Sequence, residues 1–125
     1  MNIPQDPVYT IIPLQMPLLP IKDTIIFPLM VSPLFSSRPK DRLAIEDAMK
    51  SNHFIGVFLQ RDKNIENPTL KDLYSIGTAT KIIQMVKLED GGIKILVEGL
   101  SRIRIIKLIH EDPYPVAEIE ELREF

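Results

Sequence analysis

The chain has 125 residues, a formal net charge of −2 and no cysteine, with 45% hydrophobic and 26% charged residues. This length supports one domain with its own core, and the composition is that of a globular protein, not a disordered one. The missing cysteines exclude disulfides and thiolate metal sites, and the slightly acidic charge provides no positive field for nucleic acid. No apolar run approaches the roughly 20 residues of a membrane-spanning helix, so we expect no membrane partner.

The N-terminal third is rich in proline: eight of the eleven prolines lie within the first 39 residues. Proline removes a backbone donor and fixes φ, so this part is predicted to form short extended pieces. We expect a flexible arm over residues 1–13, which has no Lys or Arg and therefore does not resemble a secretory signal. A strand over Met16–Ile21 follows, with its prolines at an edge or at the strand ends. Two further short apolar pieces are predicted at Thr24–Pro28 and Val31–Phe35.

One amphipathic helix is predicted from about Pro39 to Asn52. Ser36 or Ser37 could cap its N-terminus, and Ala44, Ile45, Ala48 and Met49 share one face. Phe54–Leu59 is continuously apolar and short, which favours a central strand that is buried on both faces. The polar segment Gln60–Asp72 is predicted to be the main surface loop, with one helical turn around Leu70.

The stretch from Leu73 to Ile109 is predicted to form an antiparallel meander. Two β-type runs meet at Glu89-Asp90-Gly91-Gly92, whose glycines tolerate the positive φ angles of a tight hairpin. We expect a third strand after Gly99, which would occupy a corner, and a bulge near Ile105-Ile106 where the apolar phase slips by one residue. A last strand is predicted over Val116–Glu120. The fold class is therefore mainly β with one α-helix, a small barrel of about six or seven mostly antiparallel strands.

No catalytic constellation is evident. The sequence contains no GxxxxGK[ST] phosphate loop and no GxSxG elbow. The two histidines, His53 and His110, have no neighbouring His or Cys that could complete a metal shell. We therefore predict no catalytic, cofactor-binding or metal-binding residues, and no cofactor, in this chain.

Two surface features are candidates for binding. Arg102, Arg104 and Lys107 lie close together and could touch phosphates, but no aromatic residues interleave with them, so a solvated face is favoured over a nucleic-acid site. The segment from Phe27 to Phe35 is unusually apolar for a region broken by proline. We expect most of it to pack in the core, and we predict that Met30 and Phe35, with Leu29 next, contribute to an exposed surface that binds polypeptide.

These residues resemble the N-terminal domain of the Lon family of ATP-dependent proteases over about residues 14–120. The first signature runs from Leu18 to Pro28 and continues with Ser32-Pro33-Leu34-Phe35. The second comprises Tyr74, Gly77-Thr78-Ala79, Lys81-Ile82-Ile83-Gln84, the Asp90-Gly91 hairpin and Val97-Glu98-Gly99-Leu100-Ser101-Arg102. The resemblance implies a PUA-like pseudo-barrel over residues 14–121, with residues 122–125 beginning the connection to absent downstream domains.

The resemblance also implies a function. Such a domain selects unfolded or damaged protein substrates and supports the assembly of a homo-oligomeric, hexameric ring. In the family, ATP and Mg belong to an ATPase domain, and proteolysis to a Ser-Lys dyad, both further along the chain. We therefore expect a cytoplasmic, non-catalytic part of an ATP-dependent serine protease that degrades misfolded and regulatory proteins. The alternatives are a stand-alone adaptor with a Lon-like or cereblon-like domain and, with less support, a PUA-like RNA-binding module.

Overall fold

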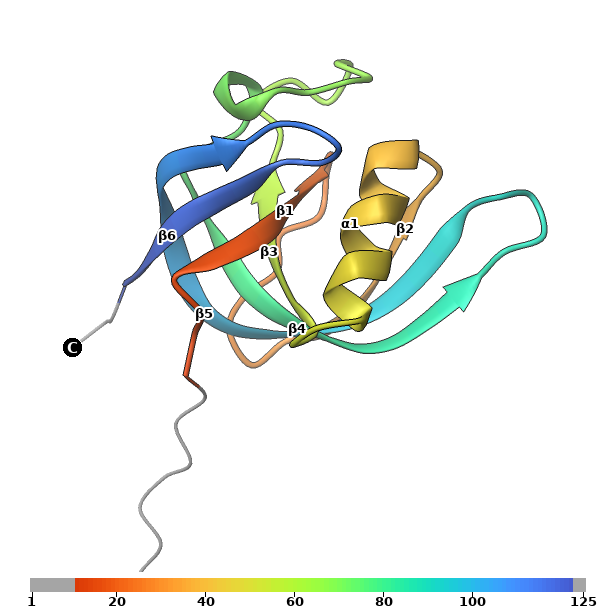
Figure 1. The fold of residues 1–125 in the computed structure, drawn as a ribbon, viewed down its shortest axis with the longest axis horizontal. Helices are drawn as coiled ribbons and strands as arrows, with labels where there is room; N and C mark the ends of the chain where they lie inside the picture. The colour runs from red at the N-terminus through yellow and green to blue at the C-terminus, as the bar shows by residue number, and fades with distance from the viewer. Residues whose placement is uncertain (1–10, 123–125) are drawn as a thin grey trace, which may run out of the picture.

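The computed structural model describes residues 11–122, in which six strands form a sheet with one α-helix packed beside it (Figure 1). The elements are, in chain order, β1 (Gln15–Ile21), β2 (Val31–Ser36), α1 (Pro39–Met49), β3 (Phe54–Leu59), the 3-10 helix η1 (Leu70–Asp72), β4 (Ile76–Lys87), β5 (Ile93–His110) and β6 (Val116–Leu122). The predicted class, mainly β with one helix, is confirmed. Most of the arm predicted over residues 1–13, and nearly all of the connection predicted over 122–125, lie outside the described residues.

The strands form one sheet that closes partly into a ring. Their order is β2-β5-β4-β3-β1-β6, and β6 also pairs with β5. Every pairing is antiparallel except that between β1 and β3. Within the described chain, β2 therefore lies outside the ring and is the edge strand of the sheet. Ring closure depends on β5, whose 18 residues pair with β2 and β4 near its start and with β4 and β6 near its end.

The two long strands bend at irregular positions. The β5–β6 register shifts between Ile105 and Lys107, so the predicted bulge near Ile105-Ile106 is confirmed. An extra residue in one strand increases its local twist and bends it, which lets the end of β5 turn across the barrel towards β6. Beyond the ring, β4 and the start of β5 project as a hairpin beside α1 (Figure 1).

The prolines of β1 are accommodated although β1 lies between two strands. Residues 15–17 pair with β6, whereas residues 18–21 pair with β3. Each half of β1 therefore has one side without a strand partner. Pro17 and Pro20, which have no N–H group to donate, do not interrupt a continuous ladder on both sides.

Two apolar clusters form the core. The first lies between α1 and the strands: Ala44, Ile45 and Ala48 of the helix pack with inward-facing residues that include Ile93, Ile95 and Val97. The second fills the ring itself, around Leu18, Phe58 and Ile103, together with Met16, Leu73, Ala79, Ala117 and Ile119. The predicted central strand is confirmed, because β3 lies between β4 and β1 and contributes residues to both clusters.

Several local predictions are wrong. Gly99 does not separate two strands, because β5 runs through it without a break; a Cβ atom there would collide with the backbone carbonyl of Phe27. Thr24–Pro28 forms no strand. The helix ends at Met49, three residues early, and its N-cap is Arg38, with no side-chain capping bond. Ser36 has another role: its hydroxyl accepts from the Arg38 N–H and donates to Asp41.

Candidate functional site

The edge strand β2 separates its side chains onto two faces. Ser32 and Leu34 are 6% exposed and point inward, whereas Val31, Pro33 and Phe35 point outward and are exposed. This alternation is the two-residue period of any strand. The outward residues lie opposite Glu98, Leu96 and Lys94 of β5, which in turn lie opposite Lys81, Gln84 and Val86 of β4.

These three strands present a surface that we call the outer face. Its apolar members are Val31, Pro33, Phe35, Ile83, Val86 and Leu96, and Leu29 and Met30 flank it at the start of β2. Ile83 is 51% exposed and lies where the β4–β5 register shifts between Ile82 and Gln84. The opposite side of the same strands packs on α1, so burial of one face leaves the other in solvent.

The three residues predicted to bind polypeptide are all exposed on or beside this face. Leu29 is 88% exposed, Phe35 67% and Met30 36%. The expectation that most of the Phe27–Phe35 segment packs in the core is wrong, because only Leu34 among its large apolar side chains is buried. The physical reason is that no strand or helix within residues 11–122 lies over the outward side of β2.

The turn before β2 is held by backbone hydrogen bonds rather than by side chains. Leu29, whose φ is +71°, donates its N–H to the Gly99 carbonyl at 2.8 Å, and Gly99 donates its own N–H to the Met30 carbonyl at 2.8 Å. Met30 donates to the Phe27 carbonyl at 3.1 Å. These bonds satisfy the polar backbone while the apolar side chain of Leu29 projects into solvent.

Two cations lie over aromatic rings, one on the outer face and one beside it. The ammonium of Lys94 is 5.5 Å from the centroid of the Phe35 ring, and the guanidinium of Arg102 is 5.8 Å from that of Phe27. Such contacts orient a ring without covering it fully, since the Phe35 side chain stays 67% exposed. The outer face therefore combines its apolar side chains with charged ones: Lys94 lies between Phe35 and Val86, and Glu98 lies between Val31 and Lys81.

The basic residues considered for nucleic acid do not form an open positive patch. Arg104 and Lys107 lie opposite Glu120 and Glu118 of β6, and the Arg104 Nε is 3.7 Å from the Glu120 carboxylate. Arg102 is engaged with the Phe27 ring. The neighbouring acidic residues reduce the positive potential that phosphate groups would require.

The histidines show no arrangement for metal binding. The Nδ1 atom of His110 lies 3.1 Å from the carbonyl oxygen of Tyr114, and His53 is half-buried with φ at +68°. Within residues 11–122, no three His, Cys, Asp or Glu side chains converge on a common point. The same part of the chain contains no helix that is both long and apolar enough to cross a membrane.

The sequence prediction missed most of the outer face: Val31, Pro33, Ile83, Val86 and Leu96 were not predicted as site residues. The alternation in Val31-Ser32-Pro33-Leu34-Phe35 does place Ser32 and Leu34 on one side of the strand and Val31, Pro33 and Phe35 on the other. That pattern could have identified the exposed set if the edge position of β2 had been known. The contribution of β4 had no local signal, because its bulge at Ile83 depends on pairing with β5.

Comparisons with known proteins agree on one family. The family model of the ATP-dependent protease La (LON) substrate-binding domain matches residues 15–124. A Lon protease from Lawsonia intracellularis is 42% identical over 113 residues, which cover 90% of this chain and 14% of the relative. A Lon protease from Endomicrobium trichonymphae is 46% identical over 91 residues, covering 73% of this chain and 11% of the relative. The chain thus spans only about a seventh of the length of such relatives.

Solved structures show the same fold. The N-terminal domain of a Lon protease from the Mycobacterium avium complex superposes with a TM-score of 0.69 and 26% identity, over 89% of this chain and 56% of that one. A Lon N-terminal domain protein from Xanthomonas campestris matches with a TM-score of 0.66 and 18% identity, over 87% of this chain and 60% of that one, which shows the fold alone. With the family model covering most of its residues, this chain belongs to the Lon protease family, as its N-terminal substrate-binding domain.

Proposed function

We propose that the outer face captures exposed apolar segments of unfolded or damaged proteins and presents them to an ATP-dependent protease. The single observation that carries this proposal is the uncovered apolar surface of β2, β5 and β4, flanked by Leu29 and Met30. An isolated apolar side chain on a surface needs no explanation, but a contiguous group on three paired strands is typical of an interaction site. The family description as a substrate-binding domain supports the same partner class.

The physical properties of the face predict how it binds. An apolar patch of a few hundred Å² gives affinities of about micromolar or weaker, which suits a module that must release what it captures. Flexible Leu and Met side chains adapt to different partners, whereas Phe35 gives a large planar contact. Binding of this kind depends on burial of apolar area, so it survives salt concentrations that screen charges.

We infer that this chain is one part of a longer protein with the further domains that the Lon family implies. The parent would carry an ATPase domain that uses ATP and Mg and a Ser-Lys protease domain, would assemble as a homo-oligomeric ring in the cytoplasm, and would degrade misfolded and regulatory proteins. The present chain would contribute recognition and assembly and no catalysis. Its coverage of 14% of the Lawsonia relative is consistent with such a division.

The test is an NMR titration of the isotope-labelled chain with a reduced, alkylated and therefore unfolded protein, at low and at high salt. We expect shifts on the outer face at both salt concentrations, and weaker binding for Met30→Ser and Phe35→Ser. Ile109→Ser is the matched control, because it removes an exposed apolar side chain, 39% accessible, from a part of β5 that pairs with neither β2 nor β4. Binding that salt abolishes, or that the control weakens as much as Phe35→Ser does, contradicts the proposal.

A further inference from the structure

A second groove lies on a different part of the molecule from the outer face. It has a volume of about 570 Å³, within the range of typical ligand sites, and it opens between η1, the loop before it and the end of β5. Its floor contains apolar side chains from segments far apart in sequence, Leu70 and Leu73 on one side and Ile105 and Ile106 on the other. Ile106 is 50% exposed, so this floor is accessible.

The rim of this groove is strongly positive for a chain of net charge −2. Arg61, Lys71 and Lys107 line it, against a single lining carboxylate, Glu111; Glu118 lies opposite Lys107 in the β5–β6 register but does not line the groove. Lys71 and Lys107 take part in no ion pair within residues 11–122. Two of the three cations therefore remain available to a ligand.

Arg61 is held in a defined position. Its Nε donates to the Leu73 carbonyl at 3.2 Å, and its guanidinium lies 4.8 Å from the centroid of the Tyr74 ring. These contacts use one of the five guanidinium N–H groups, so the terminal nitrogens stay available to donate hydrogen bonds to a carboxylate. The fixed Arg61 guanidinium can orient a bound carboxylate, and the apolar residues beside it can contact an apolar part of the same ligand.

The other large groove lacks this charge imbalance. It has a volume of about 630 Å³ beside β2, and Lys22 and Arg38 on its rim are balanced by Asp23 and Glu66. Arg38 is also committed, since it donates to Asp41 and to the carbonyl of Pro20 at 2.8 Å each. The positive rim over an apolar floor therefore distinguishes the groove at η1.

We propose that the groove between η1 and the end of β5 binds an acidic peptide segment that places an apolar side chain on Leu70, Leu73 and Ile106 and its carboxylates against Arg61, Lys71 and Lys107. Charge complementarity selects the acidic flanks, and the aliphatic floor selects an apolar anchor. A nucleic acid fits less well, because the aromatic ring nearest the groove, Tyr74, is already covered by Arg61 and no stacking platform is free among the lining residues. This site is separate from the outer face and does not depend on its function.

Fluorescence anisotropy tests the proposal with a labelled nine-residue peptide in which aspartates alternate with leucines. Two further peptides replace the aspartates by lysines or the leucines by serines. We expect the Asp-Leu peptide to bind most tightly, and we expect its affinity to fall when salt rises from about 0.05 M to about 0.5 M. Equal binding of the Asp-Leu and Lys-Leu peptides, or binding that salt does not change, overturns the proposal.

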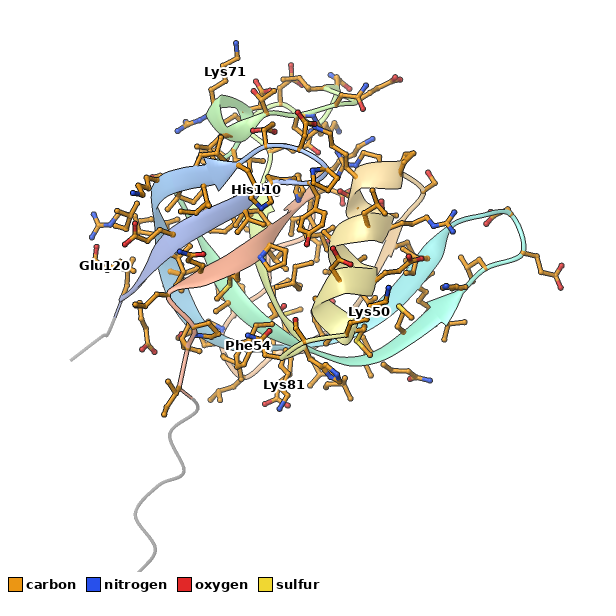
Figure 2. The ribbon with its side chains drawn as sticks, viewed as in Figure 1. Lys50, Phe54, Lys71, Lys81, His110 and Glu120 are labelled. Carbon is orange, nitrogen blue, oxygen red and sulfur yellow. The ribbon has the colours of Figure 1, made fainter. Side chains whose placement is uncertain are left out.

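Charge-reversal variants locate the site. The double change Lys71→Glu with Lys107→Glu should lower the affinity for the Asp-Leu peptide by about tenfold or more, because two attractive charges at the rim become repulsive. Lys22→Glu with Lys50→Glu makes the same change in net charge at two exposed positions outside the groove and the outer face; Figure 2 shows Lys50 well apart from Lys71. This control should stay within about twofold of the unmodified chain. Equal weakening by both pairs means that net charge, and not this groove, drives binding, and overturns the proposal.

Two additional measurements separate the remaining explanations. Ile106→Ser should lower the affinity for the Asp-Leu peptide and leave unchanged the affinity for the Asp-Ser peptide, in which serines replace the leucines. An equal effect on both affinities contradicts an apolar anchor. A single-stranded oligonucleotide that binds more tightly than the Asp-Leu peptide, and that the Lys71→Glu and Lys107→Glu pair releases, would assign the groove to nucleic acid instead. Phe35→Ser should leave Asp-Leu binding unchanged, which distinguishes this site from the outer face.

Discussion

The hydroxyl of Tyr114 donates a hydrogen bond of 2.7 Å to the carboxylate of Asp47 and so connects the turn between β5 and β6 to α1. Partial burial, together with this hydrogen bond and the negative charge of Asp47, raises the pKa of the Tyr114 phenol from 10.0 to about 12. Both partners lie far from each other in sequence. The contact therefore reports directly on the packing of the turn against the helix.

This contact predicts that the Tyr114 phenol loses its proton at a higher pH than a free tyrosine does. The difference in phenolate absorbance between the unmodified chain and Tyr114→Phe should have a midpoint at about pH 12, and Asp47→Asn should lower that midpoint. Because the pKa of Tyr114 is raised in the folded chain, its contribution to stability is complete below about pH 10 and is lost as pH rises through about 12. A midpoint near pH 10 in the folded, unmodified chain would show that the hydrogen bond is absent in solution.

A second prediction concerns Gly99, where a Cβ atom would collide with the carbonyl oxygen and carbon of Phe27. Since both neighbours are backbone atoms, the collision cannot be relieved by rotating a side chain. Gly99→Ala should lower the free energy of unfolding by about 2–3 kcal/mol. The comparison is Gly91→Ala. The φ of +90° at Gly91 is strained for alanine, but the atom nearest to the added Cβ is a flexible Arg42 nitrogen at 3.7 Å. This change should lower the free energy of unfolding by about 1 kcal/mol. Chemical denaturation measures both, and the reverse order would refute the explanation.

A third prediction concerns the polar network around Arg38. Its guanidinium donates to Asp41 at 2.8 Å, to the Gln60 side chain at 3.1 Å and to the carbonyl of Pro20 at 2.8 Å, while the Asp41 side chain is only 5% exposed. Arg38→Ala leaves a buried carboxylate without its cation and should cost about 2–4 kcal/mol.

The control for Arg38 is an exposed ion pair on the same helix. Lys40 lies 3.1 Å from Asp112, but the two side chains are 48% and 82% exposed. Lys40→Ala should therefore change the free energy of unfolding by less than about 0.5 kcal/mol. A similar decrease in the free energy of unfolding for Arg38→Ala and Lys40→Ala would indicate that helix propensity, and not the buried network, determines the decrease.

A fourth prediction concerns the packing of α1. Ile45 is 1% exposed and belongs to the cluster between the helix and the strands, whereas Leu43 is 44% exposed on the same helix. Ile45→Ala should cost about 2–4 kcal/mol through lost apolar contacts and a residual cavity, and Leu43→Ala about 0.5 kcal/mol or less. Urea denaturation followed by circular dichroism gives both values. Equal values would mean that α1 does not pack on the strands as described.

Local patterns determined most of the secondary structure. The Asp90-Gly91-Gly92 turn requires positive φ, and Gly91 has a φ of +90°, so the hairpin was predictable from residue type alone. The apolar face of α1 and the continuous apolar run of β3 likewise reflect periodicity that any one segment carries by itself. The bulge near Ile105 was visible because the apolar phase shifts within a single strand.

Tertiary structure decided what local patterns could not. Gly99 was predicted to end a strand, since glycine marks both turns and close backbone approaches, and only the position of Phe27 distinguishes the two. The exposure of Phe35, and of Leu29 and Met30 beside it, depends on which elements cover this side of the sheet, which is a property of the tertiary packing and not of the segment.

The sequence by itself therefore determined the fold class, the family resemblance and the apolar segment between Phe27 and Phe35, because turn chemistry and periodicity are written in neighbouring residues. Which side of that segment meets solvent, how Ile83 and Val86 of β4 join it, and how Arg61 comes to lie beside Ile106 were decided by the pairing of distant strands. The physical reason is that burial depends on which surfaces cover a side chain, and in a ring of strands those surfaces come from residues tens of positions away.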